Sequence, residues 1–159
     1  MIEIDGNLLE CPGGINVIGH GANTIGKMKS GIAKSIVELW PIVADADQGM
    51  HIKMSKAGLC YRGEALEVKV SEAPELFVVN LYQQATTRTS HPNKVRHVNY
   101  EALYSALVKM EKLFPSEDTH FGFPKNLGCG LAGGEWTIVK SMIDHVYQNR
   151  KVTIVNLKQ

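Results

Sequence analysis

Apolar residues along the chain follow two different spacings, and the two alternate. Short continuous runs, such as residues 76–81, are typical of a central parallel strand that is covered on both faces. Repeats at helical spacing, such as Ile32, Ile36 and Trp40, predict helices that bury one face. The expected strands are 15–19, 76–81, 120–123 and 152–157, and the expected helices are 32–40, 100–114 and 135–149.

Residues that begin or end elements agree with this division. Pro41 ends the first expected helix, Asn99 is suited to cap the second, and Pro124 ends the expected strand 120–123. The stretch from 50 to 70 is less regular, and residues 59–61 and 65–70 are expected to be strands on either side of a turn. The alternation predicts an α/β fold, a mostly parallel or mixed sheet between layers of helices, in one domain over 1–159.

The composition narrows the class of protein. A hydrophobic content of 44% and a charged content of 21% exclude a disordered chain, a coiled coil and a collagen-like repeat. A net charge of +1 argues against general nucleic-acid binding, which needs a basic excess. The cysteines Cys11, Cys60 and Cys129 form no CxxC pair, and no signal peptide or membrane-spanning run is recognised. A cytoplasmic, soluble protein is expected, without a prediction of its oligomeric state.

Two glycine-rich connections follow expected strands, where ligands bind in sheets of this kind. The first covers residues 20–31 and leads into a helix whose free N–H groups and dipole favour a phosphate. The second, 128–134, has the sequence GCGLAGG and precedes the last expected helix. The first connection alone is equally consistent with a surface turn, and the alternative for the second is tight packing of helix on strand. Together, at equivalent ends of adjacent strands, they favour a diphosphate site formed by backbone amides.

These two connections carry a resemblance. The segments 20–33 (HGANTIGKMKSGIA) and 123–136 (FPKNLGCGLAGGEW), with 4–9 and 99–103, resemble the macro domain family over nearly the whole chain. The similarity is greatest to the branch of phage and yeast-type ADP-ribose 1''-phosphate phosphatases. The resemblance implies a three-layer α/β/α sandwich that binds ADP-ribose in a cleft at the strand ends.

The resemblance also implies roles for individual residues. Asn7 stands where the family usually has an aspartate that accepts a hydrogen bond from adenine, and Asn23 would lie beside the distal ribose. The residues expected to hold the diphosphate are Gly31, Ile32 and Ala33 at the helix start and Gly128, Cys129, Gly130, Leu131, Ala132, Gly133 and Gly134 in the second loop.

His20 is the residue expected to do chemistry, together with Asn23. The sequence predicts that His20 follows a strand and opens the first loop, and the yeast-type enzymes resemble this chain in having a histidine there. An imidazole could protonate the leaving oxygen, assist water or attack phosphorus. The alternative is a histidine that is only hydrogen-bonded to backbone at a strand end. The histidines and cysteines have no metal-ligand spacing, so neither a metal nor a cofactor is expected.

The expected function is hydrolysis of ADP-ribose 1''-phosphate to ADP-ribose and phosphate. The alternatives are an ADP-ribosyl hydrolase acting on modified protein or nucleic acid, and a non-catalytic ADP-ribose reader. Glutamate-ADP-ribose hydrolases of a neighbouring branch use a lysine after the central strand and an aspartate in the glycine loop, and this chain has neither. Cys129 is interpreted as a space-filler, Glu135 as complementing a helix dipole, and Arg88 as part of a polar segment that could close over an anion.

Overall fold

A computed structural model describes residues 1–158. Its centre is a six-stranded sheet in the order β1-β6-β5-β2-β4-β3. Every neighbouring pair is parallel except β3 and β4, which form an antiparallel hairpin at one edge. The strands are β1 (Ile2–Asp5), β2 (Val17–Asn23), β3 (Ala65–Glu72), β4 (Glu75–Gln84), β5 (His120–Pro124) and β6 (Lys151–Asn156).

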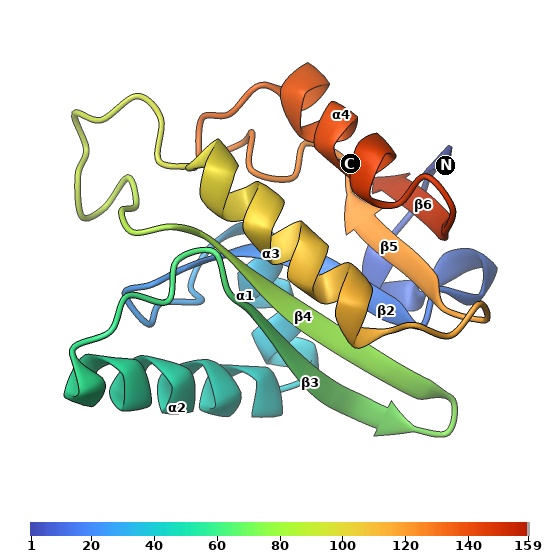
Figure 1. Ribbon diagram of the computed structural model, residues 1–159, viewed down its shortest axis with the longest axis horizontal. Helices are drawn as coiled ribbons and strands as arrows, with labels where there is room; N and C mark the ends of the chain where they lie inside the picture. The colour runs from blue at the N-terminus through green and yellow to red at the C-terminus, as the bar shows by residue number, and fades with distance from the viewer. Residues whose placement is uncertain (159) are drawn as a thin grey trace.

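Helices cover both faces of this sheet, so the predicted three-layer sandwich with a mixed sheet is confirmed. Figure 1 shows α3 and α4 on the near side of the sheet and α1 on the far side. Successive side chains of a strand point to opposite faces of the sheet, so each strand contributes core residues to both helical layers. Val79 packs under α3 and α4, whereas Val78 packs under α1 and α2. The helices are α1 (Gly31–Leu39), α2 (Ile42–Ala57), α3 (Tyr100–Leu113) and α4 (Trp136–Val146), with short 3-10 turns at Leu8–Glu10 and Pro12–Gly14.

Several expected elements are present with shifted ends. Asn99 caps α3 by accepting a hydrogen bond from the Ala102 amide, as predicted. Strand β2 begins two residues later than expected and runs on to Asn23, so it takes in residues assigned to the first loop. Strand β4 lies inside the sheet and is parallel to β2 on one side, as expected, and it is antiparallel to the edge strand β3 on the other, because the sheet is mixed.

Helix α2 was not predicted, and residues 59–61, expected to be a strand, are a connection. The face of α2 that packs inward contains the buried residues Val43 and Asp47, whereas Ile42 and Ile52 are about half exposed. Because an aspartate lies on the buried face and isoleucines lie on the outer face, the apolar residues of α2 do not recur at helical spacing. Pro41 separates two helices, and only the first has a clear apolar stripe.

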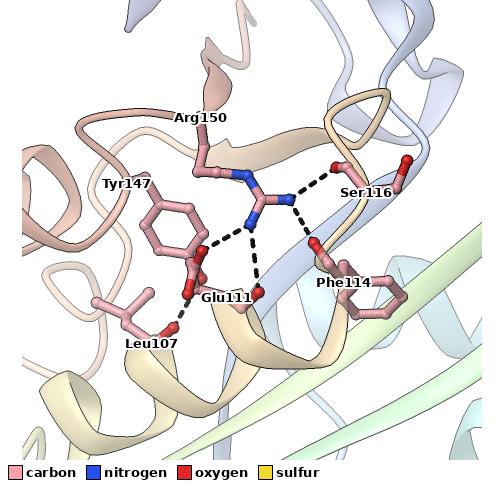
Figure 2. A network of polar contacts seen from close by, with 6 residues as sticks. All are labelled: Leu107, Glu111, Phe114, Ser116, Tyr147 and Arg150. Atoms are coloured by element: carbon pink, nitrogen blue, oxygen red, sulfur yellow. Dashed lines mark hydrogen bonds and ion pairs between the residues drawn. The ribbon is translucent and has the colours of Figure 1, made fainter.

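One polar network joins the end of α3 to the start of β6 (Figure 2). The guanidinium of Arg150 donates to the Glu111 carboxylate at 2.6 Å, to the Ser116 carbonyl at 3.0 Å and to the Phe114 carbonyl. Carbonyl groups at a helix end lack intrahelical partners, so this arginine satisfies them. Among residues 1–158, no helix is long and apolar enough to cross a membrane.

Candidate functional site

A cavity of about 820 Å³ opens where the parallel strands end. Its walls come from the segments that follow β1, β2, β4 and β5, and from the end of β6. The order of the sheet therefore fixes the layout of the cavity. Residues after β1 form one end, residues after β4 form the other, and the loops that follow β5 and β2 lie between them. The lining segments are 7–9, 21–23, 27–33, 83–84, 87–89 and 124–132.

The loop after β5 lines this cavity and contains unpaired backbone amides. It is folded by its own hydrogen bonds, from the Cys129 amide to the Asn126 carbonyl (2.8 Å) and from the Gly134 amide to the Gly128 carbonyl (2.9 Å). The amides of Gly130, Leu131 and Ala132 have no acceptor within residues 1–158, and all three residues line the cavity. Successive unpaired N–H groups of this kind form an anion-binding concavity.

The start of α1 lies in the wall of the same cavity. Gly31, Ile32 and Ala33 are its first helical residues, whose amides have no intrahelical acceptor. Ser30 occupies the cap position, but its side chain makes no capping hydrogen bond. The two glycine-rich connections thus meet at one cavity, as the sequence predicts.

Every charged side chain that lines the cavity is a cation: Lys27, Lys29, Arg88 and Lys125. No aspartate, glutamate or histidine is among the described lining residues. Lys125 is neutralised by an ion pair with Glu3 at 2.6 Å, whereas the described residues offer Lys27, Lys29 and Arg88 no such partner. In a chain whose net charge is only +1, this concentration of positive charge favours an anionic ligand.

The two asparagines predicted to meet the ligand both line the cavity. Asn7 also caps a 3-10 turn, since its Oδ1 accepts from the Leu9 amide at 3.0 Å. Asn23 shapes the following loop: its Oδ1 accepts from the amides of Ile25 (3.1 Å) and Lys27 (3.3 Å), and its Nδ2 donates to the Lys27 carbonyl (2.7 Å). One N–H of Asn23 is left for a ligand.

His20 lies elsewhere, and the prediction that it opens a loop is wrong. It is inside β2, fully buried, and it is not among the residues that line the cavity. Its Nε2 lies 2.6 Å from Oδ1 of Asn80, in a buried network with Asp47 and Tyr82. Burial lowers the pKa of His20 to about 4, so the imidazole is neutral at physiological pH.

Gly133 and Gly134 also lie outside the cavity lining and serve close packing instead. A Cβ on Gly133 would lie 2.3 Å from the Val95 carbonyl oxygen, and one on Gly134 would lie 2.6 Å from that of Gly128. Gly133 additionally has φ +76°, which a side chain disfavours. The tight-packing interpretation of the loop therefore holds for its last two glycines, and the ligand-facing interpretation fits 128–132.

The remaining candidates from the sequence have no reactive arrangement. The Cys129 thiol donates to the Leu127 carbonyl at 3.2 Å, and burial, aided by Glu135, raises its pKa, so the thiolate is disfavoured. Glu135 is exposed at the cap position of α4 and does not line the cavity. Within residues 1–158, no group of His, Cys, Asp or Glu side chains is arranged to hold a metal ion.

Gln83, Gln84, Thr87 and Thr89 line the cavity and were not predicted. The apolar run that marks β4 ends at Leu81, but the strand continues to Gln84, and its polar end enters the site. The sequence signal was present in the QQ pair directly after a buried strand, at the edge where ligands bind.

No protein-family model and no curated protein matches the sequence. Solved structures do share its fold. A protein of unknown function from Bacteroides thetaiotaomicron has a TM-score of 0.84 at 22% identity, covering 98% of this chain and 96% of its own. A macrodomain protein from Streptomyces coelicolor has a TM-score of 0.76 at 22% identity, covering 99% and 98%.

Thermosipho africanus DarTG, solved in complex with ADP-ribose, has a TM-score of 0.68 at 19% identity and covers 89% of this chain and 38% of its own. These likenesses cover between 89% and 99% of the chain. The chain has the macrodomain fold.

Proposed function

We propose that the cavity binds ADP-ribose, with the diphosphate held by backbone amides. The observation that carries the proposal is that the unpaired N–H groups of Gly130, Leu131 and Ala132 and the uncapped start of α1 belong to the wall of one cavity. A diphosphate needs several donors converging from two sides, and backbone amides supply them without a flexible side chain. The ADP-ribose complex of Thermosipho africanus DarTG, of which 38% of the chain matches this fold, supports this ligand.

The order of the strands supports one orientation of the ligand. Asn7, at the β1 end, would meet the adenine, and its amide oxygen can still accept although the charge of the family's aspartate is missing. The loops after β5 and β2 would hold the diphosphate at the centre. The distal ribose would then lie near Asn23 and the end of β4, where the remaining N–H of Asn23 can donate to a hydroxyl.

We further propose that the protein removes the phosphate of ADP-ribose 1''-phosphate. Lys27, Lys29 and Arg88 have no carboxylate partner among the described residues, and they give the cavity more positive charge than a diphosphate alone requires. In such a reaction the oxygen of water attacks phosphorus and the bond from phosphorus to the anomeric oxygen breaks; the anomeric oxygen takes up one proton from that water, and inorganic phosphate is released. Cations stabilise the charge spread over the transferred phosphoryl oxygens.

In this proposal His20 does not touch the reacting atoms. The buried, neutral imidazole forms a hydrogen bond from β2 to Asn80 and has a structural role. The chemistry depends on cations, backbone amides and Asn23. The absence of any histidine or carboxylate among the described lining residues favours a second candidate, a reader that binds ADP-ribose without cleaving it.

The test uses the purified full chain with three ligands. Calorimetry with ADP-ribose examines binding, release of inorganic phosphate from ADP-ribose 1''-phosphate examines the phosphatase, and release of ADP-ribose from an automodified target examines the hydrolase. Binding with phosphate release is expected. Binding with no release of either kind would leave the reader, ADP-ribose release alone would favour the hydrolase, and absence of ADP-ribose binding would overturn the proposal.

A further inference from the structure

We infer that Arg88 recognises a phosphate monoester on the distal ribose, and so sets the preference of the site for a phosphorylated ligand over ADP-ribose itself. The inference rests on the proposed function, since it assumes that the cavity holds ADP-ribose. Arg88 lies in the segment that follows β4 and lines the cavity.

One hydrogen bond holds the guanidinium in place. The Nε of Arg88 donates to the backbone carbonyl of Leu131 at 3.0 Å, joining the segment after β4 to the loop after β5. The terminal Nη groups have no acceptor or carboxylate partner within residues 1–158. Fixing Nε orients the plane of the group and leaves the four N–H donors of the two Nη atoms free, and this planar group can bind phosphate in a fork.

The place of Arg88 in the sheet separates it from the adenine end. Asn7 follows the edge strand β1, whereas Arg88 follows β4, four positions further across the sheet. The free amides of the β5 loop lie between the two. A ligand that runs from Asn7 across those amides therefore brings its distal ribose toward Arg88.

The charges of the cavity support the same assignment. Each phosphate in the diphosphate carries one negative charge, and a phosphate monoester adds about two more near neutral pH. The cavity offers several backbone amides for the diphosphate and, in addition, the unpaired cations Lys27, Lys29 and Arg88. Of these cations, Arg88 alone has the planar fork and is already anchored.

The segment that carries Arg88 is fastened to the glycine loop at a second point. The amide of His97 donates to the Ala132 carbonyl at 2.8 Å, so both ends of the segment contact residues that line the cavity and have unpaired amides. The competing interpretation is that Arg88 only clamps this loop. A clamp would affect all ligands equally, whereas a phosphate receptor affects only the phosphorylated one.

The experiment compares two ligands and three proteins. ADP-ribose affinity is measured by calorimetry, and ADP-ribose 1''-phosphate affinity by displacement of a fluorescent ADP-ribose in stopped flow, which reads binding before turnover. The proteins are the wild type, Arg88→Met and the matched control Arg96→Met. Arg96 belongs to the same segment but stacks on Tyr100, with its guanidinium carbon 4.8 Å from the ring centroid, and does not line the cavity.

Arg88→Met is expected to weaken ADP-ribose 1''-phosphate binding by about tenfold to a hundredfold, the usual effect of losing charge-assisted hydrogen bonds, with ADP-ribose affinity nearly unchanged. Arg96→Met should change neither. Equal losses for both ligands, or no loss for either, would overturn the inference. If the wild type binds no ADP-ribose, the proposed function itself fails, and retained ADP-ribose binding by Arg88→Met shows that the variant is folded.

Discussion

The Nε2 atom of His20 lies 2.6 Å from the Oδ1 atom of Asn80, inside the protein and between two neighbouring strands. Asn80 turns its Nδ2 toward Oδ1 of Asp47 at 3.4 Å, and Tyr82 donates to the same oxygen at 2.7 Å. Because Oδ1 of Asn80 can only accept, the proton of the neutral imidazole is on Nε2. Nδ1 of His20 has no partner among the described residues. The histidine that the sequence singles out for catalysis is thus part of a buried polar network under α2.

This burial predicts a specific dependence of stability on pH. The folded pKa of His20 is lowered to about 4 from 6.5, so below pH 6.5 the unfolded chain binds a proton that the folded chain does not. The contribution of neutral, buried His20 to the free energy of unfolding is fully present above pH 6.5 and is lost as the pH falls toward 4. From the shift of the pKa to about 4, the loss amounts to about 3 kcal/mol.

Urea denaturation at pH 7, 5 and 4 measures the effect, with wild type compared with His20→Gln. The variant should lose less stability on acidification, because glutamine has no proton to gain. Burial raises the pKa of Asp47, which opposes the trend in both proteins and cancels in the comparison. His91→Gln, at an exposed position, serves as the control. Identical acid profiles for wild type and His20→Gln would refute the assignment.

The glycines of the β5 loop should divide into two classes. Gly133→Ala places a Cβ 2.3 Å from the Val95 carbonyl at φ +76°, and is expected to cost about 2 to 4 kcal/mol of stability. Gly130→Val meets nothing within 4 Å at its Cβ and should leave stability within about 0.5 kcal/mol of wild type. It should nevertheless weaken ADP-ribose binding about tenfold or more, because the side chain occupies space beside the free amides.

Thermal denaturation and calorimetry on the two variants separate these effects. Normal ADP-ribose affinity in Gly130→Val would mean that the loop does not hold the ligand. An unchanged melting temperature in Gly133→Ala would contradict the close packing of residues 95–97 against Gly133.

Asn7 combines capping with a predicted ligand contact, and Asn99 provides a matched cap away from the cavity. Asn7 accepts from the Leu9 amide and Asn99 from the Ala102 amide, at 3.0 and 2.9 Å. Each alanine variant is expected to lose about 1 kcal/mol of stability through the missing cap. Only Asn7→Ala should also lose ADP-ribose affinity, measured by calorimetry, because only Asn7 lines the cavity. Equal affinities in the two variants would remove Asn7 from the binding site.

Arg150→Met tests the network that ties α3 to β6. The variant leaves the Phe114 and Ser116 carbonyls and the Glu111 carboxylate without their donor, and should cost roughly 2 kcal/mol or more. A double-mutant cycle with Glu111→Gln, followed by urea denaturation, isolates the contribution of the ion pair. Lys158→Met is the control, since Lys158 pairs with Asp5 in an exposed position and should change stability by less than about 0.5 kcal/mol. A loss no greater than in this control would contradict the structural role of Arg150.

Helices whose apolar residues recur at regular spacing could be predicted from the sequence. A helix with polar residues on its buried face and apolar residues on its exposed face could not. Helix α3 follows from Asn99 and a stripe of apolar residues that includes Leu103, Leu107 and Met110, because the cap and the spacing are both local signals. Helix α2 escaped prediction because Asp47 is buried through hydrogen bonds to Asn80 and Tyr82, residues far away in the sequence. A local pattern records hydrophobicity and does not record whether a polar group will find a buried partner.

For the site, the sequence by itself determined that two glycine-rich connections follow strands, and that the chain folds as a mostly parallel or mixed sheet between layers of helices. These properties follow from the spacing of apolar residues and from glycine, whose effects act over a few residues. Only the tertiary structure decided that His20 turns into the protein and that Gly133 packs against backbone. It also decided that Arg88, anchored on Leu131, faces the cavity. The direction of a side chain depends on neighbours brought together by folding, and strand pairing sets those neighbours at distances that no local window of sequence contains.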